Sequence, residues 1–197
     1  AFWINMGAVA ITTLAGSMTS GQITITDGVP PQTVKSLQGT SKFEVLLPSV
    51  PGAPQILPIN AVKSPTDELQ LRQAILSAIA RATLVKTLWF GTVKIAYGPL
   101  SSPTWAYDPK VETMYPYNPD KAAQLLDEAG WKKGSGGTRA KNGQQMEIVY
   151  ITDNSAVDSQ AGQLVQSYLN QVGMKVTLQV LEYAATADAY LAGKHNI

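Results

Sequence analysis

The segment Tyr150-Ile-Thr-Asp-Asn-Ser155 carries the polar groups that are best placed for binding a ligand. It joins the carboxyl end of a predicted parallel strand to the next predicted helix, and open α/β sheets bind ligands at that edge through loop side chains and helix amides. We therefore predict ligand contacts from Tyr150, Thr152, Asp153 and Asn154, which offer hydroxyl, carboxylate and amide groups for hydrogen bonds. The alternative is that the polar residues of this turn only cap the helix.

Two aromatic residues, Trp105 and Tyr107, are predicted to lie behind this polar turn. They belong to the proline- and aromatic-rich segment from Val93 to Tyr117, which shows no clear periodicity. Long loops in compact domains are usually functional or held down by their own side chains, and ligand pockets are often lined by aromatic rings. The alternative interpretation is that these rings fasten the loop to its domain.

Residues for catalysis or metal binding are scarce. The chain has no cysteine, and His195 is its single histidine, near a chain end that we expect to be frayed. The glycine-rich stretch Lys133-Gly-Ser-Gly-Gly137 does not end in Gly-Lys-Ser/Thr, so we predict an exposed hairpin connection there rather than a phosphate-binding loop. Nothing pairs the acidic residues as acid and base. The sequence thus favours a non-catalytic protein without a metal or other cofactor.

The composition indicates a folded protein without a polyanionic partner. The 197 residues are 45% hydrophobic, which is enough for a sizeable core, and 15 basic residues against 14 acidic ones give a net charge of +1. Such a charge attracts neither nucleic acid nor an anionic membrane, and no apolar run approaches the roughly 20 residues that span a bilayer. The chain begins without methionine and ends abruptly at Ile197, so we expect it to be a piece of a longer protein.

Helices and strands alternate in the second half of the chain. A helix from Asn118 to Gly130 has an N-cap residue, a proline at its first position and a glycine at its end. Predicted after it are a tight turn at Asn142-Gly143, a strand at Met146–Ile151, a helix from Val157 to Gly173, a strand at Lys175–Leu181 and a helix at Tyr183–Leu191. A strand, a helix and a strand of these lengths imply a right-handed parallel crossover.

The first part of the chain has weaker signals. Predicted there are a helix over Ala8–Met18, a strand at Gln22–Thr26, a turn at Gly28–Pro31, a short helix at Gln32–Leu37 and extended segments at Phe43–Leu47 and Gln55–Asn60. The loop from Pro48 to Pro54 is dense in proline and glycine, which makes it a candidate hinge.

An amphipathic helix is predicted from Ser64 to Arg81, with Ser64 as its N-cap and Pro65 as its first residue. Its apolar face repeats at helical period and consists of Leu71, Ala74, Ile75, Ala78 and Ile79. After a break, the helix is expected to continue toward Trp89.

Several of these segments, taken in order, resemble the ABC-transporter solute-binding proteins of the peptide, nickel and opine type. The most specific match to the family's pattern is Tyr117-Asn-Pro-Asp-Lys-Ala-Ala-Gln-Leu-Leu-Asp-Glu-Ala-Gly-Trp131. Further matches are Leu-Arg-Gln-Ala-Ile and Ala-Ile-Ala-Arg within the Ser64–Arg81 helix, Tyr97-Gly-Pro-Leu100 and Gln171-Val-Gly-Met-Lys-Val176. Met18-Thr-Ser-Gly-Gln-Ile-Thr-Ile25 resembles another element of the family. Departures from the pattern, mostly at cap and scaffold positions, weaken the resemblance little, and they are Gln22, Thr24, Ala80 and Asn118.

The resemblance implies an incomplete α/β lobe of the periplasmic-binding-protein type, type II and cluster C, with a mixed sheet flanked by helices. Residues 1–54 would be the tail of the first lobe and the approach to the hinge, and residues 55–197 would be most of the second, C-terminal lobe. Proteins of this kind close two lobes on a ligand and present the closed form to a membrane permease.

The implied function is a non-catalytic receptor for a peptide or another small polar ligand in an ABC importer. The implied location is the periplasm or another extracytoplasmic place, with a lipid anchor on the full-length protein as one option. The implied partners are the ligand, the membrane permease and the remainder of the same protein, and not nucleic acid. An alternative is the solute-sensing domain of a transcription regulator. Binders of peptides, nickel, sugars and opines share this scaffold, so the ligand stays open.

Overall fold

The computed structural model describes residues 11–26 and 29–197. The chain divides into two compact units, one made of Ala1–Ser49 with Val85–Lys94 and the other of Val50–Leu84 with Ile95–Ile197. The helix α4, Arg81–Leu88, belongs to both units and is the continuation predicted after the break. The division predicted between residues 54 and 55 concerns the lobes of a longer protein and stays a prediction.

The first unit contains the helices α1, Ile11–Thr19, and α2, Pro31–Gln38. The strand predicted at Gln22–Thr26 is wrong. The N–H groups of Gln22 and Ile23 donate to the Ser17 carbonyl at 2.9 and 3.3 Å, which winds this stretch onto the end of α1 instead of extending it. α2 confirms the predicted short helix, whereas the start of the helix predicted from Ala8 and the turn at Gly28 lie outside the described residues.

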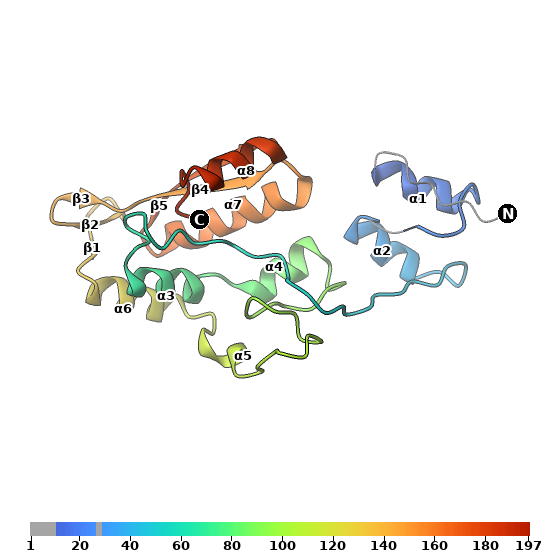
Figure 1. Cartoon of the computed structure of the whole chain (residues 1–197), viewed down its shortest axis with the longest axis horizontal. Helices are drawn as coiled ribbons and strands as arrows, with labels where there is room; N and C mark the ends of the chain where they lie inside the picture. The colour runs from blue at the N-terminus through green and yellow to red at the C-terminus, as the bar shows by residue number, and fades with distance from the viewer. Residues whose placement is uncertain (1–10, 27–28) are drawn as a thin grey trace. The chain divides into compact units, whose positions relative to one another are not determined.

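Two parallel strands form the centre of the second unit (Figure 1). β4, Glu147–Asp153, and β5, Lys175–Leu181, pair from Glu147 opposite Lys175 to Asp153 opposite Leu181. α7, Ala156–Gln171, connects them. The parallel pairing of β4 and β5 through α7 confirms the predicted crossover. Gly173, predicted to end the helix, follows α7 with a φ of 91°.

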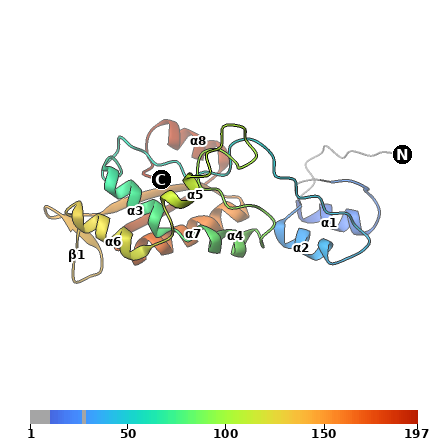
Figure 2. The same ribbon diagram turned by 90° about the horizontal axis from the view of Figure 1, so that it is seen from below.

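Helices cover both faces of this strand pair (Figure 1). On one face, β4 residues such as Ile148 and Tyr150 share the main core with α7 and with the apolar sides of α3, Leu69–Ala78, and α6, Pro119–Glu128. Figure 2 shows α3 and α6 packed side by side. On the other face lies α8, Tyr183–Leu191, whose Tyr190 hydroxyl donates to the Ile151 carbonyl at 2.7 Å. The bounds of α8 are those that the sequence predicts.

α3 begins four residues later than the sequence predicts, at Leu69 with Glu68 as N-cap, so the assignment of Ser64 as N-cap and Pro65 as first residue is wrong. The chain turns between Lys63 and Glu68, with a cis peptide bond before Pro65. The Thr66 hydroxyl donates to the carbonyls of Asn60 and Lys63 at 2.7 and 2.8 Å, which holds the turn. The predicted apolar face is confirmed, since four of its members are at most 1% exposed and the fifth is 7% exposed: Leu71, Ala74, Ile75, Ala78 and Ile79.

Two further extended segments lie beside β4 on the side away from β5. The N–H of Asn196 donates to the Val149 carbonyl and the N–H of Ile151 to the Ile197 carbonyl, at 2.8 and 2.9 Å. In turn, the N–H of Asn60 donates to the Asn196 carbonyl at 2.9 Å. Asn60 is thus the end of the predicted extended segment Gln55–Asn60 that reaches the sheet, although neither this segment nor Phe43–Leu47 forms a strand.

The side chain of Asn196 is buried and satisfies both kinds of hydrogen-bonding group. Its Oδ1 accepts from the Val149 N–H at 3.0 Å, and its Nδ2 donates to the Ser64 carbonyl at 3.0 Å and to Thr66 Oγ1 at 3.1 Å. The neighbouring His195 is only 8% exposed, so the expectation of a frayed chain end at this residue is wrong. The pairing with β4 and Asn60 is what buries it.

Two side chains of α7 cover the start of the outer edge of β5, the edge that faces away from β4. Asn170 Oδ1 accepts from the Val176 N–H at 3.1 Å, and Gln166 Nε2 donates to the Val176 carbonyl at 2.8 Å. The two side chains are four residues apart and therefore lie on one face of the helix. Both outward backbone groups of Val176 are satisfied in this way.

A small antiparallel sheet follows α6 and consists of β1, Lys132–Lys133, β2, Arg139–Lys141, and β3, Gln144–Gln145. The glycine-rich stretch Lys133–Gly137 connects β1 to β2, as predicted, and Asn142 and Gly143 make the predicted tight turn with φ values of 52° and 80°. The predicted cap of α6 is confirmed too, since Asn118 Oδ1 accepts from the Lys121 N–H at 2.8 Å.

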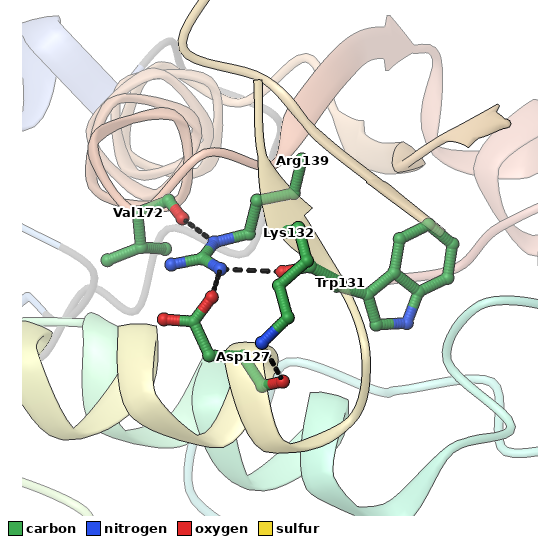
Figure 3. Close-up of polar contacts among 5 residues, drawn as sticks. All are labelled: Asp127, Trp131, Lys132, Arg139 and Val172. Atoms are coloured by element: carbon green, nitrogen blue, oxygen red, sulfur yellow. Dashed lines mark hydrogen bonds and ion pairs between the residues drawn. The ribbon is translucent and has the colours of Figure 1, made fainter. Parts of the chain in front are cut away.

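Arg139 fastens this small sheet to the ends of two helices (Figure 3). Its Nε donates to the Val172 carbonyl at 2.7 Å, at the end of α7. Its Nη1 donates to Asp127 Oδ1 at 2.8 Å and to the Trp131 carbonyl at 2.6 Å, at the end of α6. The Arg139 side chain is only 3% exposed, and a cation is favoured at helix carboxyl ends, where unpaired carbonyls gather.

Replacing Arg139 by methionine removes these donors and leaves buried carbonyls unpaired. We expect Arg139→Met to lower the free energy of unfolding by about 2–4 kcal/mol, measured by urea denaturation. The matched control is Lys133→Met in exposed β1, which should change it by less than about 0.5 kcal/mol. Equal losses for the two variants would contradict the role given to Arg139.

Candidate functional site

Tyr150 and Thr152 lie on β4 with their side chains largely packed, at 5% and 9% exposure. Their face of the strand meets α7 at Gly162, where a Cβ would come within 3.2 Å of Thr152 Cγ2 and 3.0 Å of Leu178 Cδ1. Glycine at this position permits the close approach of helix and strand. Burial first, and then the neighbouring Tyr190, raise the pKa of Tyr150 to about 12, so its hydroxyl keeps its proton at neutral pH.

The turn after β4 is organised by capping. Ser155 is the N-cap of α7, and its Oγ accepts from the Asp158 N–H at 3.2 Å and donates to Asp158 Oδ2 at 2.5 Å. Asp153 Oδ1 accepts from the Ser155 N–H at 2.8 Å. The capping interpretation therefore applies to Ser155 and to one oxygen of Asp153, while Asn154 is exposed.

Trp105 and Tyr107 lie in the long loop that contains the short helix α5, Val111–Met114. Trp105 is 97% exposed, whereas the Tyr107 hydroxyl donates to Glu112 Oε1 at 2.8 Å within the same loop. Arg81 holds the loop at two other points, by stacking over the Tyr97 ring at 5.2 Å and by donating to the Tyr115 carbonyl. The interpretation that aromatic rings fasten the loop to its domain therefore applies to Tyr97. It does not apply to Trp105, whose side chain is exposed.

A short stretch of chain, Val50–Gln55, contacts the loop that contains Trp105 and the first turn of α7, and we call it the strap. The Gly52 N–H donates to Thr104 Oγ1 at 3.0 Å, next to Trp105. Gln55 Nε2 donates to Asp158 Oδ1 in the first turn of α7, next to the Asp153–Ser155 turn. Because three residues extend over at most about 10 Å, the two contacts of the strap, at Gly52 with the Trp105 loop and at Gln55 with the first turn of α7, lie no farther apart than that along the strap.

Sequence reasoning missed Gln55, Thr104 and Asp158, which make these contacts. The signal for Asp158 was present, since a serine followed three residues later by an acidic residue is a capping pattern. Gln55 and Thr104 had none, because their partners lie 103 and 52 residues away along the chain. Two surface cavities of about 340 and 360 Å³ are lined by none of the predicted ligand residues.

Groups for metal binding do not come together in the part of the chain that the structure describes, where no three His, Cys, Asp or Glu side chains form a candidate site. Nor is any described helix long and apolar enough to cross a membrane. His195 has Nδ1 buried without a hydrogen-bond partner, and its ring lies 4.2 Å from that of Tyr190, centroid to centroid. No carboxylate among the described residues accepts a hydrogen bond from this Nδ1, as the acid of a catalytic triad would.

The sequence profile of the bacterial extracellular solute-binding proteins of family 5, middle region, matches residues 4–197. The chain belongs to this family. The family resemblance read from the sequence motifs is thereby confirmed, and family 5 members are extracellular or periplasmic solute-binding proteins.

Curated relatives of this family 5 chain include two binding proteins. The oligopeptide-binding protein AppA of Bacillus subtilis is 31% identical over 122 residues, which cover 60% of this chain and 22% of the relative. The nickel-binding periplasmic protein of Escherichia coli is 31% identical over 125 residues, which cover 62% of this chain and 24% of the relative. The matches thus span about a quarter of the length of these relatives.

Solved structures show the same fold. NikA from Brucella suis, in complex with Fe(III)-EDTA, superposes with a TM-score of 0.71 at 26% identity, covering 94% of this chain and 38% of NikA. A periplasmic oligopeptide-binding protein from Thermotoga maritima gives a TM-score of 0.77 at 24% identity, covering 96% of this chain and 38% of that protein. The predicted fold class, an α/β lobe of the periplasmic-binding-protein type, is confirmed. Parallel and antiparallel pairs occur in two separate sheets of the described chain, the parallel pair in β4–β5 and the antiparallel pairs in β1–β3.

The burial of His195 makes the stability of the fold depend on pH. Burial, and next the charge of Lys63, lower the pKa of His195 below its ordinary value of 6.5. As pH falls through 6.5, the unfolded chain takes up a proton that the folded chain refuses, so the folded state loses stability until the lower folded-state pKa is reached. Because this is the only histidine, we expect His195→Gln to flatten the decline in melting temperature between pH 7 and pH 5. Parallel pH profiles for the two proteins would contradict the assignment.

Proposed function

We propose that this chain is part of a non-catalytic solute receptor of an ABC importer, and that residues 55–197 supply one wall of its ligand cleft. Residues 1–54 would then be the tail of the first lobe and the approach to the hinge. The observation that carries the proposal is the family match over residues 4–197. It is supported by an almost fully exposed Trp105 next to one contact of the strap, and by the Asp158 side chain at the other contact, which is bonded to the turn after β4.

The proposed ligand is a peptide or another small polar molecule. Asn154 is exposed and offers both a donor and an acceptor, and Asp153 uses only Oδ1 in the turn. Tyr150 and Thr152 precede these residues on β4 and are largely buried, while Trp105 offers an exposed, flat apolar surface. Tyr107 follows Trp105 two residues later in the same loop. Polar groups that fix orientation beside an aromatic surface are typical of small-molecule sites. The relatives named for oligopeptides and for nickel differ in ligand, so the family alone does not choose one.

The proposed partners are a membrane permease and the remainder of the same protein, and the proposed location is the periplasm or another extracytoplasmic place, with a lipid anchor as a further option. Two-lobe closure would place a second wall over this one, so that affinity comes from both walls. The transcription-regulator alternative gains no support from the relatives, whose names describe binding proteins.

Binding can be tested on the gene product that carries this sequence. The melting temperature is measured with pooled oligopeptides of two to five residues, with glutathione and with Ni²⁺, since a ligand that binds only the folded state raises it. We expect at least one of these probes to raise it in a concentration-dependent manner. No shift with any of them, and no ABC permease encoded beside the protein, would argue against the receptor.

Trp105 should contribute to binding and not to folding. We expect Trp105→Ala to weaken binding of the active probe about tenfold or more, because a large aromatic contact is lost, and to change the free energy of unfolding by less than about 0.5 kcal/mol. Binding is measured by calorimetry. The control is Leu191→Ala, which truncates another exposed apolar side chain, 89% exposed on α8, and should leave affinity unchanged. Unchanged affinity in Trp105→Ala would remove this residue from the site.

A further inference from the structure

The strap is part of the second unit and is bonded to other segments of that unit at Val50, Gly52 and Gln55. At its start, the Ser101 Oγ donates to the Val50 carbonyl at 2.8 Å and the Ser101 N–H donates to the Gly52 carbonyl at 2.9 Å. The Gly52 N–H returns a bond to Thr104 Oγ1. The Ser101–Thr104 loop therefore clasps residues 50–52, and Trp105 is the next residue after the clasp.

At its other end, the strap continues into the polar turn through a chain of hydrogen bonds. Gln55 Nε2 donates to Oδ1 of Asp158, and Oδ2 of the same carboxylate accepts from Ser155 Oγ. Ser155 in turn donates its N–H to Asp153 Oδ1. A movement of Gln55 thus reaches Asp153 through two intervening side chains, without passing through the buried core.

We propose that Gln55 is a positioning residue of the ligand site, which orients the Asp153–Ser155 turn through Asp158 and keeps that turn in register with Trp105. The proposal rests on the proposed function, because it concerns the same site. Gln55 itself need not touch the ligand. Its contribution lies in the geometry of the turn, since an exposed hydrogen bond adds little to overall stability.

The chemistry at position 55 is specific. One oxygen of the Asp158 carboxylate accepts from Ser155, which leaves the other oxygen to accept from Gln55. A glutamine amide supplies that donor without a charge. A leucine of similar size keeps the shape of the side chain and removes the donor, while an arginine supplies N–H donors at a similar reach and should restore the link.

The first arm of the test uses the protein without ligand. Amide hydrogen exchange is measured at Ser155 and Asp158, and the indole N–H resonance of Trp105 is followed by NMR. We expect Gln55→Leu to speed exchange at both amides about fivefold, which corresponds to the loss of one hydrogen bond, and to shift the Trp105 resonance. Gln55→Arg should return both readouts toward the wild type, and the melting temperature should stay constant throughout.

The matched control is Gln124→Leu. Gln124 is also exposed and donates to a carboxylate, Glu128 Oε1 at 2.7 Å, within α6. We expect no change at Ser155, Asp158 or Trp105 in this variant. Equal effects of the two glutamine substitutions, or no effect of Gln55→Leu, would overturn the positioning role.

The second arm measures affinity for whichever of the oligopeptide, glutathione and Ni²⁺ probes binds the wild type. We expect Gln55→Leu to weaken binding several-fold and Gln55→Arg to recover it. If the wild type binds a probe and Gln55→Leu binds it equally well, the positioning role fails while the proposed function stands. If the wild type binds none, the proposed function fails, and the exchange data alone decide whether Gln55 orients the turn.

Discussion

The buried amide of Asn196 is the interaction on which the second unit depends. Its side chain and backbone together contact β4, the turn before α3 and the segment that ends at Asn60. A buried polar group must find all its partners, because each unpaired one carries a desolvation cost that water can no longer offset. An asparagine provides a donor and an acceptor on one short, rigid side chain, so only one register of the three segments satisfies it. The position of α3, and with it the main core, follows from this register.

The sequence anticipated the parts of the fold whose signals are local. Asn118 and Pro119 mark the start of α6, and the Asn142-Gly143 pair makes the turn between β2 and β3. The alternation along Lys175–Leu181 is that of a strand, although of its apolar face only Val176 is buried. The start of α3 was misplaced because a serine and a proline in a helical context look like a cap and a first residue. What decides otherwise is Thr66, whose hydroxyl bonds back to Asn60 and Lys63, and sequence order alone carries no sign of these bonds.

The candidate site divides in the same way. The polar turn after β4 was predictable, because the end of a parallel strand and the start of a helix are both visible in the sequence. The relation of that turn to the Trp105 loop was not, since it is set by contacts of Gly52 and Gln55 with residues more than fifty positions away. The burial of His195 was missed for a similar reason: a residue near the end of a chain is buried only if distant segments cover it.

The side chains of Gln166 and Asn170 give β5 a property that its own sequence lacks. They form hydrogen bonds with the outward backbone groups of Val176, which are the groups that another strand would otherwise pair with. Because they come from a helix, these bonds do not extend the sheet. An open edge of a sheet is a template for aggregation, and natural proteins blunt such edges with side chains, bulges or covering elements. In this unit the crossover helix that makes the parallel pair also covers the start of its outer edge at Val176, so the same element that assembles the pair blocks one point where another strand could add.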